Sequence, residues 1–217
     1  PAIGWKIDAY ADFYKFPWLK FLVDAPSYGK DFLAQVTFTP NRQVEIYTRF
    51  KTETKQANQS DNTTVTNFLV NLPKQNWRTQ ISYKLNTSFT IRNRVELLWF
   101  DNNGVNKANG FLTFFDFMYK PMLKPLSAVL RLQYFETDDY NSRIYAYEND
   151  ILYEFFIPFY QNRGSRFYIN TRLRLGRNYT WEFRIGRTYF ENVNTIGSGN
   201  ELINGNTRTE IKTQLKI

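Results

Sequence analysis

The sequence contains no cysteine and no histidine among its 217 residues. Without cysteine it has neither disulfides nor thiolate metal ligands, and cysteine usage gives no information on the redox compartment. The absence of histidine also excludes Ser-His-Asp and Cys-His nucleophilic sites and the usual zinc ligand sets, which leaves carboxylate, lysine or tyrosine chemistry. We therefore expect no enzyme activity, no catalytic residue, no metal site and no cofactor.

Long hydrophobic runs are missing as well. No window of about 18 consecutive apolar residues occurs, and a transmembrane helix needs at least that length. The mean hydropathy is −0.52, which on its own would indicate a soluble protein. Strands that alternate apolar and polar residues give a negative value even when they cross a bilayer, so hydropathy does not exclude a membrane protein.

Aromatic residues and positive charge are what the sequence has in excess. Phe, Tyr and Trp make up 18% of the chain, which is far above ordinary usage. So many aromatic side chains must pack against an extensive apolar surface. The net charge of +8 suits a nucleic-acid partner, an anionic lipid surface or a cation-lined lumen. The positions of the charges along the predicted strands must decide between these partners.

The dominant pattern is an alternation with period two. In residues 3–14, Trp5 and Ile7 are on one face of the predicted strand, and Lys6 and Asp8 are on the other. This pattern is typical of a strand between one apolar and one wet environment. It predicts eleven strands, at 3–14, 31–39, 43–53, 77–86, 89–99, 111–120, 127–135, 144–157, 166–175, 179–189 and 207–217.

The length of these segments favours a membrane barrel over a soluble sandwich. Strands of about ten residues can cross a bilayer when tilted, whereas soluble strands average five or six. We therefore predict an all-β fold, a single domain over residues 1–217, that is an antiparallel transmembrane β-barrel, or the C-terminal portion of one, with about 11 to 12 strands. The side chains predicted to face lipid are Ile7, Phe38, Ile46, Ile81, Leu97, Trp181 and Leu215, and the aromatic residues predicted at the membrane interfaces are Trp5, Trp77, Trp99 and Tyr179.

The connections are predicted in two sizes, as in barrels with short periplasmic turns and longer extracellular loops. Short turns are expected at 40–42, 86–88 and 176–178, and long loops at about 16–30, 54–76, 101–110 and 191–206. With eleven crossings, however, the turn at Gly176 and the final residue Ile217 fall at the wrong end of the barrel. We therefore expect residues 136–150, in which acidic residues interrupt the alternation, to run through the lumen.

Charged side chains at alternate positions are predicted to face the lumen. They are Arg92, Arg94, Arg131, Arg172, Arg174 and Arg184, with Glu148, Asp150 and Glu154 on the inner face of one strand. The arginines either attract anions or pair with acidic residues in a filled interior, and pairing is the favoured interpretation. The three carboxylates have a spacing that a calcium site or an acid-base pair could use, but pairing with arginine is again favoured.

Aromatic residues interleaved with basic ones could also stack the bases of a single-stranded nucleic acid. Tyr10, Tyr14, Tyr47, Tyr168 and Arg166 are arranged in this way. Any barrel strand shows the same interleaving, so nucleic-acid binding is not the favoured interpretation.

Several short motifs resemble the C-terminal β-barrel part of Bacteroidota helix-hairpin-helix domain proteins. The motifs are the segment 4–14, Phe16-Pro17-Trp18-Leu19, Asp24-Ala25-Pro26-Ser27, the segment 142–150, and Ile196-Gly197-Ser198-Gly199 with Glu201. The resemblance implies an outer-membrane location and a longer protein with helix-hairpin-helix segments ahead of the barrel. It implies architecture more than activity.

The leading hypothesis is an integral outer-membrane barrel that acts as a subunit or accessory of a larger envelope assembly, such as a secretion, uptake or barrel-insertion machine. Its expected partners are outer-membrane lipids and other outer-membrane or periplasmic subunits. One alternative is a self-contained transport channel. Another is a surface protein whose long loops bind a polymer, a glycan or DNA.

Closure of the barrel is the last expectation. An odd strand count leaves sheet edges unpaired, and unpaired edges are not tolerated in hydrocarbon. We expect residues 1–217 not to close into a barrel on their own, and we expect further strands before Pro1 to pair with the strands at 3–14 and 207–217. Internal closure, through a further crossing hidden in 16–30 or 144–157, is the alternative.

Overall fold

The computed structural model describes residues 3–21, 23–59, 65, 67–102, 106–176 and 178–217. It confirms the predicted all-β antiparallel fold, and the described residues include a single short 3-10 helix, Gly199–Glu201. No helix in this part of the chain has the length and apolar character needed to cross a membrane.

Ten strands form one antiparallel sheet in the order β1-β2-β3-β4-β5-β6-β7-β10-β11-β14. Their bounds are β1 (Trp5–Phe16), β2 (Ser27–Phe38), β3 (Val44–Asn58), β4 (Leu69–Lys84), β5 (Phe89–Asn102), β6 (Asn106–Tyr119), β7 (Leu126–Thr137), β10 (Arg163–Leu175), β11 (Tyr179–Phe190) and β14 (Thr207–Lys216). Two small pairs lie outside this sheet, β8 (Ile144–Tyr145) with β9 (Phe159–Tyr160) and β12 (Thr195–Ile196) with β13 (Ile203–Asn204).

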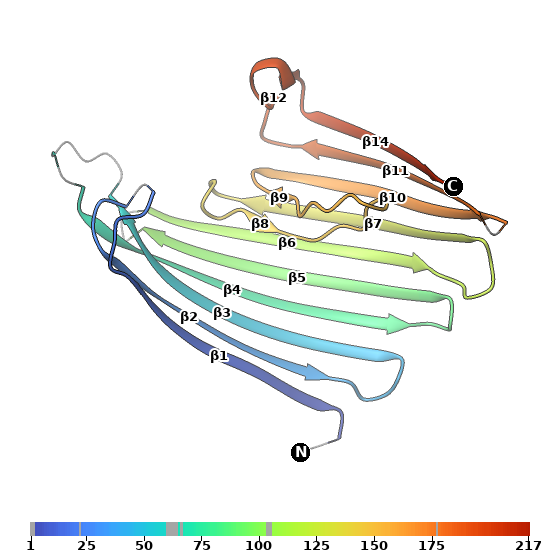
Figure 1. Ribbon diagram of the computed structural model, residues 1–217, viewed down its shortest axis with the longest axis horizontal. Helices are drawn as coiled ribbons and strands as arrows, with labels where there is room; N and C mark the ends of the chain where they lie inside the picture. The colour runs from blue at the N-terminus through green and yellow to red at the C-terminus, as the bar shows by residue number, and fades with distance from the viewer. Residues whose placement is uncertain (1–2, 22, 60–64, 66, 103–105, 177) are drawn as a thin grey trace.

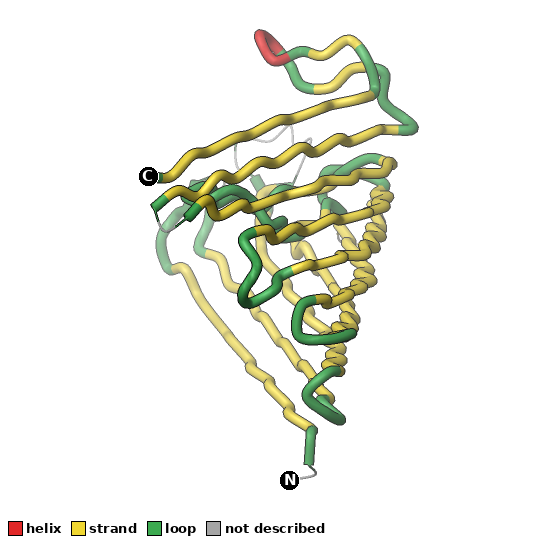
Figure 2. Tube along the Cα trace, turned by 90° about the vertical axis from the view of Figure 1, so that its right-hand side faces the viewer, coloured by secondary structure: helices red, strands yellow, loops and turns green. Residues whose placement is uncertain are grey.

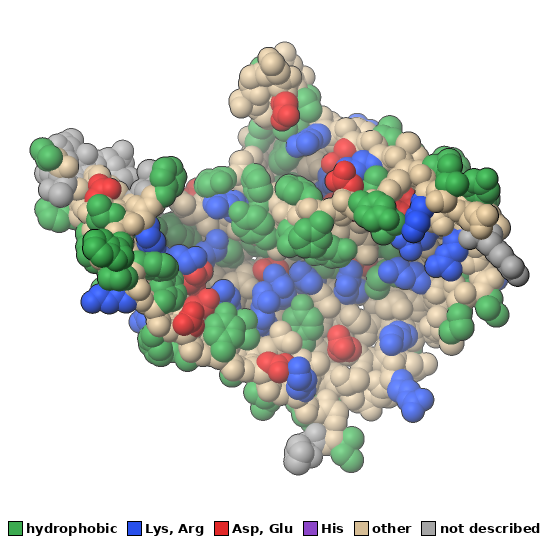
Figure 3. Space-filling view, in the orientation of Figure 1, with side chains coloured by type: hydrophobic (Ala, Val, Ile, Leu, Met, Phe, Trp, Pro, Cys, Tyr) green, Lys and Arg blue, Asp and Glu red, His purple; other side chains and the backbone are tan. Residues whose placement is uncertain are grey.

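The large sheet curls into a trough, and its edge strands β1 and β14 are not paired with each other (Figures 1 and 2). Residues 138–162, which connect β7 to β10 and are called the inner segment below, lie within the trough. Figure 3 views the concave face, where Lys and Arg side chains are interspersed with acidic ones. The trough thus has a concave face that the inner segment partly covers and a convex face on the outside.

The alternation of side chains separates the residues of the two faces as predicted from the sequence. Arg131 on β7 donates to the carbonyl of Tyr147 in the inner segment, which identifies the concave face. Through the register of the sheet, Arg92, Arg94, Arg172, Arg174 and Arg184 lie on that same face. The convex face carries the whole set predicted to face lipid, namely Ile7, Phe38, Ile46, Ile81, Leu97, Trp181 and Leu215.

Aromatic rings occur along the convex face, several of them at one end. At the end of the sheet that carries the short turns, called the turn end, Trp5 stacks on Phe38 with ring centroids 4.4 Å apart. Tyr179, the first residue of β11, lies at the same end. Trp99 lies nearer the opposite end, called the loop end, whereas Trp77 is at the middle of β4, directly across from Phe50.

The predicted strand at 144–157 is wrong. Only Ile144–Tyr145 forms a strand there, and it pairs with Phe159–Tyr160 inside the trough instead of joining the wall. The wall therefore has ten strands in place of eleven, and the direction conflict disappears. The connections 39–43, 85–88, 120–125 and 176–178 now lie together at the turn end, although Arg177 lies outside the described residues. A segment does lie inside the trough, as predicted for 136–150, but its bounds are 138–162.

The loop at 191–206 between the wall strands β11 and β14 has the predicted bounds, but the other three long loops are shorter than predicted. β3 continues to Asn58, β4 begins at Leu69, and β5 and β6 extend through most of the expected loop at 101–110. The hydrogen bonds between β3 and β4 join backbone groups, so the pairing continues to Asn58 and Leu69 although the side chains there do not alternate between apolar and polar. The hydrophobic alternation marks only the part of each strand that has one apolar neighbour environment.

Candidate functional site in the trough

The inner segment is held by a small apolar cluster on the concave face. Ile144, Ala146 and Tyr160 of the inner segment are buried with apolar side chains of β5, β6 and β7. Phe135 of β7 contacts Tyr160 with ring centroids 5.2 Å apart. The alternating concave positions of β5 to β7 are apolar near the loop end, so this part of the trough is filled by protein and not by water.

A close approach of backbone fixes where the inner segment begins. Asp139 accepts hydrogen bonds from the backbone N–H groups of Asn141 (2.8 Å) and Ser142 (2.9 Å), which forms an Asx turn. Gly110 of β6 lies beneath this turn, and a Cβ atom there would overlap the carbonyl oxygen of Ser142. Glycine at position 110 therefore permits the turn to rest on β6.

The centre of the concave face holds a fully buried ion pair. Arg131 donates from Nε to Asp116 Oδ1 (2.6 Å) and from Nη2 to Oδ2 (2.8 Å), and both side chains are completely inaccessible. Arg92 donates to the same Asp116 Oδ2 at 2.5 Å. Because Arg131 also donates to the carbonyl of Tyr147 (2.7 Å), the pair ties β5, β6 and β7 to the inner segment.

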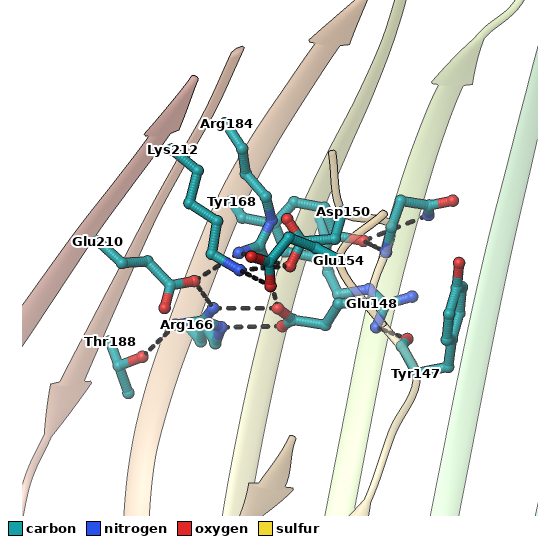
Figure 4. A network of polar contacts seen from close by, with 12 residues as sticks. Tyr147, Glu148, Asp150, Glu154, Arg166, Tyr168, Arg184, Thr188, Glu210 and Lys212 are labelled. Atoms are coloured by element: carbon teal, nitrogen blue, oxygen red, sulfur yellow. Dashed lines mark hydrogen bonds and ion pairs between the residues drawn. The ribbon is translucent and has the colours of Figure 1, made fainter. Parts of the chain in front are cut away.

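A second network surrounds Glu148 of the inner segment (Figure 4). Glu148 accepts from Arg166 Nε (2.8 Å) and Nη2 (3.0 Å), from Arg184 Nη2 and from the Tyr160 hydroxyl (2.5 Å). Glu210 of β14 accepts from the same two arginines. This network joins β10, β11 and β14 to the inner segment.

Lys212 of β14 extends the network toward the turn end. Its Nζ donates to Asp150 Oδ2 (2.8 Å) and Glu154 Oε2 (3.3 Å) (Figure 4). Farther along, the backbone N–H of Leu152 donates to Glu182 (2.5 Å), which also accepts from Arg172 (2.5 Å). The inner segment is thus anchored along most of its length by charge-assisted bonds.

The structure pairs most of the predicted charged residues with opposite charges, which was the favoured interpretation, but the three carboxylates do not have the predicted arrangement. Glu148, Asp150 and Glu154 do not share one face of a strand, because the inner segment is irregular there. They meet cations from other strands instead. Carboxylates pair with Arg92, Arg131, Arg172 and Arg184, whereas Arg94 bonds to the Gln80 amide and Arg174 has no ion pair among the described residues.

Sequence analysis did not single out Tyr160, Glu210 or Lys212 as site residues. Lys212 and Glu210 are visible as polar alternate positions of the last strand, but nothing local indicates their partners, since Arg166 and Glu210 are 44 residues apart. Tyr160 lies in a segment without alternation, so no pattern could have identified it.

The arrangement binds and positions the inner segment, and it offers little acid-base chemistry. Both oxygens of Glu148 already accept hydrogen bonds, so this carboxylate is not available as a general base. Burial, together with the neighbouring Glu148, raises the pKa of the Tyr160 hydroxyl well above its ordinary value, which keeps it protonated as a donor. Within the described residues, no group of three or more acidic side chains could hold a metal ion.

Two cavities flank the inner segment. One of about 510 Å³ lies between the inner segment and β11 and β14, with Tyr160, Phe190 and Arg208 among its lining residues. The other, about 390 Å³, lies at the turn end and includes Lys124 and Arg174. Both are partly enclosed hollows of the trough beside the charged networks.

Comparisons of the chain with protein families, with curated proteins and with solved structures gave no match. The resemblance to Bacteroidota helix-hairpin-helix domain proteins therefore stays a prediction from the sequence motifs.

Replacement of Gly110 by valine is expected to loosen the inner segment. The added side chain overlaps Ser142, and overpacking of about 1–3 kcal/mol should make amide exchange roughly ten- to hundred-fold faster at Ala146, Asn149 and Leu152. Hydrogen-exchange mass spectrometry of residues 138–162 measures this change. Ala128→Val adds bulk on the convex face and serves as the control. Unchanged exchange in Gly110→Val would show that the turn does not rest on β6.

Proposed function

We propose that this chain forms part of the wall of an integral bacterial outer-membrane β-barrel. We propose that it serves as a subunit or accessory of a larger envelope assembly for secretion, uptake or barrel insertion. The observation that carries the proposal is the division of one long-stranded antiparallel sheet into an apolar convex face and a charged concave face. The motif resemblance to Bacteroidota outer-membrane proteins supports the same location.

The convex face has the properties of a lipid-facing surface. Ile7 is 73% exposed and Leu215 is 59% exposed, and each of the ten strands carries apolar side chains at convex positions. An apolar surface of this extent is not stable in water. The aromatic rings at the turn end, among them Trp5, Phe38 and Tyr179, are placed as expected for an interfacial girdle of a membrane barrel.

The filled interior favours an accessory or subunit over a self-contained channel. The inner segment packs against β6, β7, β10, β11 and β14, and most of the concave arginines in this half bond to carboxylates. An open channel would present such charges to water. The filled trough over β6 to β14 therefore favours a structural role, in which the wall positions other parts of an assembly.

The unpaired edges also favour participation in a larger structure. β1 and β14 have no partner strand on their outer sides among the described residues, and an unpaired backbone group in hydrocarbon costs several kcal/mol. Since the first and tenth strands of an antiparallel sheet run in opposite directions, closure needs either direct pairing or an even number of added strands. We propose that strands from outside the described sheet occupy both edges.

Spin labels at adjacent residues test the membrane proposal. The chain has no cysteine, so single Ile81→Cys and Ser82→Cys variants can be labelled without background. In lipid vesicles, the label on the convex face at position 81 should collide readily with oxygen, and the label on the concave face at position 82 should collide with a water-soluble nickel complex. Equal accessibility of the two labels to both reagents would refute a lipid-facing convex surface.

A further inference from the structure

The concave face of β3, β4 and β5 near the turn end is not covered by the inner segment. The described contacts of the inner segment with β4 and β5 lie toward the loop end, at Lys74, which donates to the carbonyl of Asn141 (3.2 Å), and at the apolar cluster that includes Leu98 and Phe100. The positions closer to the turn end face the open part of the trough, where Figure 3 shows basic side chains.

Arg49 of β3 lies in this uncovered region without a carboxylate partner. It is directly across from Arg78 of β4, which is itself across from Glu96 of β5. Arg78 occupies both oxygens of Glu96, at 2.7 and 2.8 Å, and Asn76 adds a third hydrogen bond. Arg49 Nε is buried and has no hydrogen-bond partner among the described residues.

Within the described part of the chain, Arg94 of β5 has only neutral hydrogen-bond partners. Its Nε and Nη2 donate to the side-chain carbonyl of Gln80, at 3.0 and 2.7 Å, and its guanidinium lies 5.0 Å from the centre of the Phe114 ring. The same Gln80 oxygen accepts the Tyr47 hydroxyl at 3.4 Å. Arg94 Nη1 therefore remains available as a donor.

The charges in this region do not balance. Five guanidinium groups, those of Arg49, Arg78, Arg92, Arg94 and Arg131, share two carboxylates, Glu96 and Asp116. The other acidic side chains at neighbouring positions make no ion pair with these arginines, since Asp8 pairs with Lys6 and Glu45 is exposed. Partly buried cations without counter-charges are costly, and a bound anion would offset that cost.

We propose that Arg49 and Arg94 form a binding site for an oxyanion group, a phosphate or a carboxylate, of a solute or glycan that enters the trough. Arg94 extends over β4 to Gln80, and Arg49 is across from Arg78 of β4, so the two arginines flank β4. Arg94 Nη1 and the guanidinium of Arg49 offer charged N–H donors, which phosphate and carboxylate oxygens accept in short, strong hydrogen bonds. The site does not require that the convex face be in lipid.

Equilibrium dialysis of the full 217-residue chain in nonionic detergent, at fixed ionic strength in sodium chloride, tests the site. The probes are inorganic phosphate and glucuronate, which separate a phosphate-bearing from a carboxylate-bearing ligand. We expect saturable binding of one of them, and we expect Arg49→Gln with Arg94→Gln to raise its Kd at least about ten-fold. Arg187→Gln, on the convex side of β11, is the control and should leave the Kd unchanged.

A second variant distinguishes loss of the binding site from loss of the fold. If the glutamine variant loses its strand content by circular dichroism, Arg49→Lys with Arg94→Lys keeps both charges and removes the planar forks, and it should still weaken binding several-fold. Unchanged binding in the folded variant, or weak binding that chloride suppresses equally in all chains, would overturn the proposal. Because the assay uses no bilayer, its failure is distinct from failure of the spin-label test.

Discussion

Asp116→Ala is expected to lower the free energy of unfolding by about 3–5 kcal/mol. Among the residues that the structure describes, Asp116 is the only carboxylate that bonds to Arg131, whose side chain is fully buried, and it also accepts from Arg92. Its removal leaves a buried guanidinium without a counter-charge. Denaturant titration of the chain refolded into detergent or lipid vesicles, followed by strand content, measures the loss.

Two further variants make this result specific. Asp8→Ala removes a carboxylate whose partner Lys6 is solvent-exposed, and it should cost less than about 1 kcal/mol. Asp116→Leu combined with Arg131→Met removes both charges of the buried pair, so it should recover a large part of the stability lost by Asp116→Ala. If Asp116→Ala costs no more than Asp8→Ala, the buried pair does not exist in the folded protein.

Val36→Arg is expected to destabilise the membrane-inserted protein by roughly 2 kcal/mol or more. Val36 lies on the convex face of β2, between the aromatic residues Phe32 and Phe38, and is directly across from Ile7. An arginine there would be placed in hydrocarbon if this face contacts lipid. Unfolding from lipid vesicles in guanidinium chloride measures the change.

The adjacent residue provides the matched control. Gln35 lies on the concave face, directly across from Asp8 on one side and from Arg49 on the other. Gln35→Arg therefore adds the same side chain away from the convex surface, next to one carboxylate and one arginine. We expect a smaller loss of stability from this substitution in vesicles than from Val36→Arg. A similar cost for both variants would indicate that the two faces of β2 have the same environment.

The sequence alone determined the strands of the wall and the two faces of the sheet. Period-two alternation is a local property, because successive side chains of an extended chain must point in opposite directions. For this reason β5 and β11 begin where predicted, at Phe89 and Tyr179, and the residues predicted to face lipid share one side. The same logic underestimated β3 and β4 at the loop end, because the end of β3 is mostly polar and the apolar residues at the start of β4 do not alternate.

Residues 144–157 show where local patterns mislead. Ile144 and Ala146 alternate with Tyr145 and Tyr147 as in a wall strand, so the sequence predicted a crossing there. In the structure, those two aliphatic side chains pack on Phe135 and its neighbours inside the trough. An alternating segment joins the wall only if no other apolar surface buries its apolar side chains. Here strands distant in the sequence form such a surface inside the trough.

The charge partners were likewise decided by tertiary structure. The sequence indicated that the concave arginines and the acidic residues should pair, because buried charges need counter-charges. It could not indicate that Glu148 bonds to Arg166 and Arg184, or that Arg49 and Arg94 are left over. Ion pairing acts over a few ångströms between residues tens of positions apart, so only the curvature of the sheet and the path of the inner segment determine which charges meet.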